Sequence, residues 1–226
     1  DLADGGQTDV TPGATLASQE EGGATATGTF SRGIADGSTK LKVRYSGRRL
    51  LIPLSVTRFN TYPPLDFRKD IIPLFSKLGC NSGGCHGKAS GQNGFKLSLL
   101  GFEPIEDYEY LVKEGRGRRL FPAAPDRSLL LLKAAGILPH GGGHRLEVDS
   151  PPYRVVRRWI EQGMPYGKAD DPVVSRIEVF PKERIMERKG QQQIGVIAHY
   201  TDGSAQDVTR MAQFDSNDTE MAEITV

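Results

Sequence analysis

Only two cysteines occur in this chain of 226 residues, and they frame one short segment: Cys80, four residues ending in Gly83 and Gly84, then Cys85 and His86. A helix rotates by about 100° per residue, so thiols three positions apart differ by about 60°, whereas thiols five positions apart differ by about 140°. The four-residue spacer must therefore loop out of any helix. We expect Gly83 and Gly84 to allow this, because glycine adopts positive φ angles at little steric cost.

Two cysteines followed directly by a histidine are typical of covalent haem attachment, although the usual spacer has two residues. In such a site the thiols add across the haem vinyl groups and the adjacent histidine binds the iron. The segment thus predicts one covalently bound haem c per chain. Cys80 and Cys85 are the predicted attachment residues, and His86 is the predicted proximal ligand.

Three other interpretations of the motif stay open. A Cys80–Cys85 disulfide would close an acceptable small loop, but it would leave His86 without a role. A zinc site could use both cysteines and two of His86, His140 and His144, although structural zinc sites have short paired spacings and 54 positions separate His86 from His140. A nucleophilic cysteine would need a base and an oxyanion site, and the segment carries no local signature of either.

A second axial ligand is expected from the loop that precedes the last predicted helix. In this loop His140 follows Pro139 and precedes three glycines, and His144 comes next. We expect His140 to be the distal ligand, with His144, Met164 and an open distal position as the alternatives. Met164 is followed by a proline, as in the usual Met-Pro ligand pair, but it lies after the last helix. Histidine in place of methionine lowers the reduction potential.

A basic cluster lies between these two motifs, at Arg116, Arg118 and Arg119. Arginine pairs with carboxylates through two parallel hydrogen bonds, so Arg118 and Arg119 are candidates to bind the haem propionates. A solvated loop without a partner is the alternative.

The composition is that of a globular chain, with 37% hydrophobic and 25% charged residues. The 29 Lys and Arg against 28 Asp and Glu give a net charge of +1, which argues against a nucleic-acid-binding polycation. No apolar run approaches 18 residues, which excludes a transmembrane helix. The first residues have no basic stretch and no apolar core, so we expect no signal peptide in this chain. Haem c is assembled outside the cytoplasm, which favours a processed or excised part of an exported protein.

The predicted elements run in the order β, α, β, which indicates an α+β fold. The predicted segments are a linker, a β segment, a small all-α domain and a second β segment, at residues 1–27, 28–60, 61–168 and 172–226. The linker has few apolar residues. Two alternating runs around a turn at Ser46 and Gly47 predict a hairpin with one buried face. Strict alternation over residues 194–200 predicts another strand, and Val208 and Phe214 suggest further short strands.

Three short helices are expected in the all-α domain. Asp66 can cap the first helix, and Pro73 would kink it. The second helix is expected over residues 126–135. The third has the clearest signals, with Ser150 as its N-cap and Gly163 at its end.

Several separated motifs of the chain resemble the c-type cytochrome domain of large planctomycetal cell-surface proteins. They are Asp66-Phe-Arg-Lys-Asp-Ile-Ile-Pro, the segment from Cys80 to Gly87, Gly94-Phe-Lys-Leu-Ser-Leu, Pro139-His-Gly-Gly-Gly and Trp159-Ile-Glu-Gln-Gly. The resemblance covers residues 64–168. It implies thioethers at Cys80 and Cys85, His86 as the proximal ligand and His140 as the distal ligand. It also implies an exported protein, periplasmic or at the cell surface.

The flanking segments resemble halves of bacterial Ig-like (group 2) modules, which surround this domain in those proteins. Ile177-Glu-Val-Phe-Pro and His199-Tyr-Thr-Asp-Gly-Ser resemble the front half, and residues 39–47 with 52–56 resemble the back half. A lone half would expose its apolar face and a strand edge. We therefore expect residues 28–60 and 172–226 to pair into one Ig-like sandwich, within one chain or across two chains of a homodimer.

The sequence therefore predicts a cytochrome c that transfers single electrons to and from redox proteins it does not identify, rather than a catalyst. A haem enzyme or gas sensor with an open distal site is one alternative. A structural surface module stapled by a metal or a disulfide is another.

Overall fold

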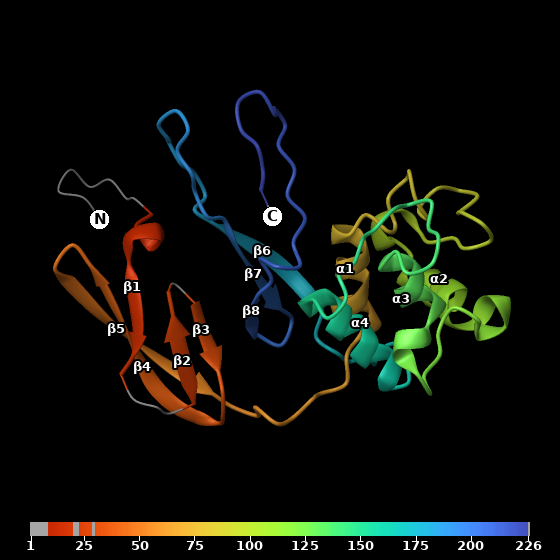
Figure 1. Ribbon diagram of the computed structural model, residues 1–226, viewed down its shortest axis with the longest axis horizontal. Coiled ribbons are helices and arrows are strands. Elements are labelled where there is room, and N and C mark those ends of the chain that lie inside the picture. Colours follow the sequence, from red (N-terminus) through yellow and green to blue (C-terminus); the bar gives the residue numbers. More distant parts are fainter. Residues whose placement is uncertain (1–8, 20–22, 29, 226) are drawn as a thin grey trace. The chain divides into compact units, whose positions relative to one another are not determined.

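The computed structural model describes residues 9–19, 23–28 and 30–225 and has a mixed α+β fold with three small sheets (Figure 1). The chain divides into two compact units. One comprises the described residues up to Pro63 together with Met186–Gln193, and the other comprises Pro64–Ile185 together with Ile194 and the described residues after it. Among the described residues, no helix is long and apolar enough to cross a membrane.

The first unit is built from five strands in two sheets. The larger sheet has the order β1-β4-β5 and the smaller pairs β2 with β3; the strands are β1 (Thr15–Ser18), β2 (Ala24–Thr27), β3 (Phe30–Gly33), β4 (Gly37–Tyr45) and β5 (Arg48–Val56). Strands β4 and β5 confirm the predicted hairpin. Its turn residues Ser46 and Gly47 have φ angles of 45° and 75°, as expected of a two-residue turn that matches the strand twist.

Two features of this unit differ from the sequence analysis. Strands β1 and β2 lie within residues 1–27, where composition indicates a linker; residues 1–8 and 20–22 of that segment lie outside the described residues. These strands contain threonines, which suit strands, and β1 pairs along β4. The hairpin also buries less than expected, because Leu41 is buried whereas Leu50 and Ile52 are 61% and 41% exposed.

The first helix of the second unit begins where the sequence predicts. The carboxylate of Asp66 accepts hydrogen bonds from the backbone N–H groups of Arg68 and Lys69, at 2.7 and 3.2 Å. At Pro73 the helix changes type, and the predicted kink itself stays a prediction. A wide π turn over Phe67–Ile71 gives way to the α-helix α1 (Ile72–Lys77), which has this proline in its first turn.

The last helix, α4 (Pro151–Glu161), also confirms its sequence signals. The Ser150 hydroxyl accepts a hydrogen bond from the Tyr153 N–H at 3.4 Å, and Gly163 follows the helix with a φ of 83°. Trp159 is fully buried and donates its indole N–H to the carbonyl of Pro165. These contacts fix α4 in the core of the second unit.

The middle of the helical region differs from the prediction. The expected helix over residues 126–135 is the shorter α3 (Leu129–Ala134), preceded by a separate 3-10 turn. Ser128 does not cap α3 through its side chain; its hydroxyl accepts from the N–H of Phe121 instead. Helix α2 (Pro104–Tyr108), which continues into a π turn, was not predicted.

The aromatic core of the second unit centres on Phe67, which is fully buried. Its ring lies 5.4 Å from that of Trp159 and 5.3 Å from that of Tyr108, measured between centroids. Phe75 and Leu97 are also buried in this cluster. Both of these side chains reach the pocket described below, so the core forms part of its wall.

The second unit ends in an antiparallel sheet with the order β6-β7-β8, formed by β6 (Val174–Phe180), β7 (Gly195–Tyr200) and β8 (Ala205–Asp207). Val196 and Ala198 are buried, which confirms the alternation predicted over residues 194–200. The short strand expected at Val208 corresponds to β8, which ends one residue earlier, and the Val208 N–H donates to the Val196 carbonyl of β7 at 2.8 Å. The described residues after Asp207 contain no strand, so the one expected at Phe214 is absent.

The Ig-like sandwich expected from the two flanks is not confirmed. Among the described residues, each strand shares a sheet only with strands of its own flank. The pairing of residues 28–60 with residues 172–226 therefore stays a prediction.

Candidate functional site

The segment between the two cysteines forms a closed, hydrogen-bonded loop after α1. The Cys80 N–H donates to the Phe75 carbonyl at 2.8 Å, a bond that ends α1 after the positive φ of Gly79. The His86 N–H then donates back to the Cys80 carbonyl at 3.0 Å. This last bond spans the spacer, so the spacer does loop out as the helix geometry requires. Two residues that the motif separates, Cys85 and Cys80, therefore lie on the same side of the loop and line one pocket.

The glycines act differently from the prediction. Gly83 and Gly84 are not among the described glycines with positive φ; the positive angle, 71°, is at Gly79, before the first cysteine. The tightest glycine of the loop is Gly87, where a Cβ atom would lie 2.0 Å from the carbonyl oxygen of Asn81. The loop thus closes because residue 87 has no side chain.

His86 is half-buried and held by one hydrogen bond to the backbone. Its Nδ1 lies 3.0 Å from the carbonyl oxygen of Phe95, and its ring centroid lies 4.6 Å from the Phe95 ring. A carbonyl only accepts, so Nδ1 carries the hydrogen and Nε2 keeps its lone pair. Burial lowers the pKa of His86, which favours the neutral form that a metal ligand requires.

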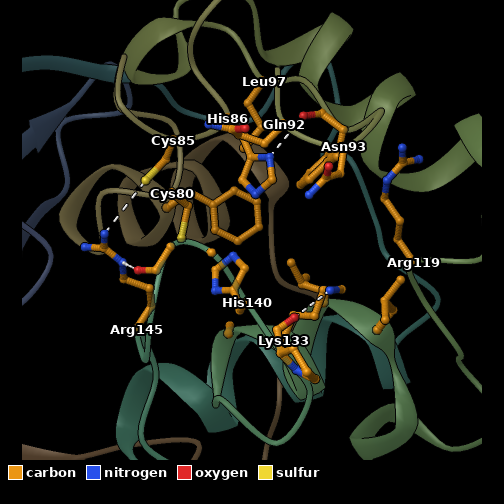
Figure 2. Close-up of a pocket in the computed structure, with 18 of the residues that line it drawn as sticks. Cys80, Cys85, His86, Gln92, Asn93, Leu97, Arg119, Lys133, His140 and Arg145 are labelled. Carbon is orange, nitrogen blue, oxygen red and sulfur yellow. Dashed lines mark hydrogen bonds between the residues drawn. The ribbon is translucent and has the colours of Figure 1, made fainter. Parts of the chain in front are cut away.

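His140 faces His86 across the pocket (Figure 2). Its Nδ1 lies 2.9 Å from the carbonyl oxygen of Gly143, so the same argument assigns the hydrogen to Nδ1 and the lone pair to Nε2. The two imidazole centroids are 6.2 Å apart and the ring planes differ by 11°. The structure therefore brings together two histidines that stand 54 positions apart in the sequence.

This separation suits two ligands of one metal ion. An imidazole nitrogen binds a transition metal at about 2.1 Å and lies about 1.2 Å from its ring centre, so two rings on opposite sides of one metal have centroids about 6.5 Å apart. The observed 6.2 Å is close to that value. The distance between the two ring centres is therefore compatible with two imidazoles that share one metal ion.

The pocket between the two histidines has a volume of about 550 Å³. Its apolar wall comes from core and α3 side chains, namely Phe75, Phe95, Leu97, Leu129, Leu130 and Ala134. Four cationic side chains line it as well: Arg118, Arg119, Lys133 and Arg145. Among the described residues that line it there is no carboxylate, in a chain whose charges almost balance. This lining suits a ligand that has both apolar surface and negative groups.

Both cysteines are free thiols, so the disulfide weighed in the sequence analysis is not formed. Burial raises the pKa of Cys80 to about 11. The sulfur of Cys85 accepts a long hydrogen bond, 3.8 Å, from a guanidinium nitrogen of Arg145 (Figure 2). Both thiols therefore line the pocket that contains the two imidazoles without being bonded to each other.

The zinc alternative finds no support in the geometry. It requires both cysteines and two histidines around one ion. Among the described residues, no group of three or more His, Cys, Asp or Glu side chains could hold a metal ion.

The alternative distal ligands lie away from the pocket. His144 is exposed and its Nε2 pairs with Glu147 at 3.4 Å. Met164 packs against the hydrophobic core, and its carbonyl accepts from the Tyr108 hydroxyl. Neither side chain is among those that line the pocket.

The two arginines proposed for the propionates have different surroundings. Arg119 is buried and donates to the carbonyls of Tyr110, Glu114 and Gly94, and its guanidinium lies 4.7 Å from the centre of the Phe95 ring. These contacts give Arg119 a structural role in the wall. Arg118 is exposed at the pocket and is the better placed of the two to reach a bound carboxylate.

The sequence analysis missed three residues that shape the site. Phe95 supplies the carbonyl that orients His86, and Lys133 and Arg145 donate to carbonyls of the loop that carries His140. Every residue has a backbone carbonyl, so the sequence alone could not identify Phe95 as the acceptor for His86. The two cations could have been noticed only as basic residues near the glycine-rich loop.

Comparison with protein families, with curated proteins and with solved structures gave no match. The interpretation of the site therefore depends on its geometry and on the sequence motif.

Proposed function

We propose that this chain carries a c-type cytochrome domain, with one haem bound covalently between His86 and His140. The observation that carries the proposal is the facing pair of imidazoles, 6.2 Å apart, in the pocket that Cys80 and Cys85 also line. Either histidine alone is unremarkable on a protein surface. Their parallel placement beside both free cysteines of the chain is what favours haem over the other uses of these residues.

Each residue of the site has a separable part in this function. Cys80 and Cys85 hold the ring covalently, and the Phe95 carbonyl fixes the orientation and tautomer of His86. His140 would bind the iron from the side opposite His86. The apolar wall excludes water, and Arg118 offers a positive charge to a propionate. Bound there, the haem iron would supply reversible one-electron chemistry.

The position of His140 favours an electron carrier over a haem enzyme or gas sensor. A haem enzyme or gas sensor would need one side of the group to be free of a protein ligand, whereas His140 faces His86 across the pocket, 6.2 Å away between ring centres. Axial coordination by two histidines gives a lower potential than coordination by histidine and methionine. The proposal includes an exported location, periplasmic or at the cell surface, because haem c is attached outside the cytoplasm. The electron donor and acceptor are then redox proteins of that compartment.

The test is the intact mass and colour of the chain expressed with export and a haem-attachment system. We expect the 24.7 kDa polypeptide plus one haem, retained in acidified acetone, and a pyridine haemochrome spectrum of a two-thioether haem. Cys80→Ala and Cys85→Ala should each leave one thioether and shift that spectrum. A colourless chain with the polypeptide mass alone would refute the proposal.

A matched pair of histidine variants tests the axial assignment. His140→Ala should convert the ferric protein from low-spin to high-spin and open it to carbon monoxide in the ferrous state. His144→Ala removes a neighbouring, exposed histidine of the same loop and should leave the spectrum low-spin. The reverse pattern would show that His140 is not the ligand.

A further inference from the structure

The loop that carries His140 is held to helix α3 in two ways. At its base, backbone bonds join it to the end of the helix: the Leu138 N–H donates to Leu132 and the Arg145 N–H donates to Ala134, at 3.0 and 2.8 Å. These bonds fix where the loop leaves and returns. They do not involve the residues on either side of the imidazole.

Two cationic side chains hold the tip of the loop. The Lys133 ammonium, from α3, donates to the Pro139 carbonyl at 2.8 Å, and the Arg145 guanidinium donates through Nε to the Gly142 carbonyl at 2.7 Å. These two carbonyls flank His140 in the sequence. Figure 2 shows Lys133 and Arg145 on different sides of the His140 ring, both at the pocket.

Apart from the ring contact with His86, the tip has two hydrogen bonds within itself. The Gly143 N–H donates to the His140 carbonyl, and Nδ1 of His140 donates back to the Gly143 carbonyl. The imidazole also packs on Gly142, where a Cβ atom would lie 3.0 Å from its Cε1. The ring and the tip therefore form one small body, and the two cations connect that body to the rest of the domain.

We propose that Lys133 and Arg145 are positioning residues that set how firmly His140 occupies the distal side of the haem. This inference depends on the proposed function. The glycine-rich tip exchanges between a closed state, with the imidazole at axial distance, and an open state. An external ligand binds only the open state, so its apparent affinity is its intrinsic affinity multiplied by the open fraction. The two hydrogen bonds lower that fraction.

Lys133→Met is the sharpest variant, because it removes the ammonium and keeps an unbranched stem of similar length. Arg145 also contacts Cys85, so its replacement would disturb haem attachment as well. Lys133→Arg restores a cationic donor. Lys113→Met serves as the matched control, since Lys113 is exposed and pairs with Glu109 outside the pocket.

The first measurement is the equilibrium affinity of the ferrous, haem-loaded chain for carbon monoxide. Hydrogen bonds to charged groups are stronger than neutral ones, and Lys133 is half-buried. We expect Lys133→Met to bind carbon monoxide about tenfold more tightly, equivalent to about 1.4 kcal/mol of closure. Lys133→Arg should return most of this change, and Lys113→Met should match the parent. Equal affinities of Lys133→Met and the parent would overturn the proposal.

The second measurement is hydrogen exchange of the chain as purified, whatever its haem content. Lys133→Met should speed exchange of the Gly143 amide, which bonds within the tip, by several-fold. Amides of α4 should keep their protection, which shows that the variant is folded. Unchanged exchange in the tip would refute the positioning role even if no haem were attached. A colourless chain whose tip does loosen would instead refute only the proposed function.

Discussion

Gly87 offers the most direct test of how the cysteine loop is built. In Gly87→Ala the new methyl carbon would lie 2.0 Å from the Asn81 carbonyl oxygen, 2.7 Å from its carbon and 2.9 Å from the Ser82 carbonyl oxygen. All three are backbone atoms, so no side-chain rotation relieves the clash. The loop must move by about 1.4 Å to restore van der Waals contact.

This displacement determines how much the free energy of unfolding of Gly87→Ala should fall. Overpacking in a closed structure costs about 1–3 kcal/mol, and losing one backbone hydrogen bond, such as that from the Leu100 N–H to Asn81, costs about 1 kcal/mol more. We expect a loss of about 3 kcal/mol in the free energy of unfolding. For a protein of this size that lowers Tm by about 6–12 °C.

The assay is thermal and urea unfolding followed by the fluorescence of Trp159, the one tryptophan of the chain. It lies in the core of the unit that contains the loop, so it reports on the right transition. Gly84→Ala is the matched control, because no atom lies within 4 Å of its added methyl group. It should change stability by less than about 0.5 kcal/mol. Equal stability of the two variants would show that loop closure does not depend on Gly87.

Three further predictions concern the surrounding domain. Asp66→Ala removes the cap of the first helix and should lower the free energy of unfolding by about 1–2 kcal/mol in urea, whereas Asp170→Ala, at an exposed site, should not change it. Arg119→Met leaves three carbonyls without their donor and should lower the free energy of unfolding by about 3 kcal/mol. The exposed Arg118→Met should lower it by less than about 0.5 kcal/mol. Equal losses in the two variants would contradict the structural role of Arg119. Burial raises the pKa of Tyr153 from 10.0 to about 12, so its contribution to stability is complete below pH 10 and is lost as the pH rises through 12. Between pH 10 and 12, the free energy of unfolding should fall less for Tyr153→Phe than for the parent chain.

Local signals in the sequence predicted much of the secondary structure. These signals depend on interactions within a few residues. The structure confirms the helix caps at Asp66 and Ser150 and the turn at Ser46 and Gly47. The strands β1 and β2 were missed because a polar, threonine-containing segment becomes a strand only when a partner is available.

The candidate site depends on both local and distant information. The cysteines and His86 form one contiguous motif, so the sequence alone identifies them. His140 was selected by its position before the last helix, and its placement opposite His86 could be established only from the folded chain. The prediction that Gly83 and Gly84 close the loop through positive φ angles is wrong, because neither residue adopts one. The structure shows that closure depends instead on the space left at Gly87, which no periodicity reveals.

Both imidazoles of the site are oriented by main-chain oxygens, those of Phe95 and Gly143. A peptide oxygen has no protonation equilibrium in the physiological range, unlike the aspartate or glutamate that orients many histidine ligands. Acidification would therefore leave these two anchors intact, and a substitution at Phe95 or Gly143 would not delete the acceptor itself. Evolution could then adjust the basicity of these two histidines only by changing the length or the turns of a loop, because such changes move the peptide oxygen relative to the imidazole.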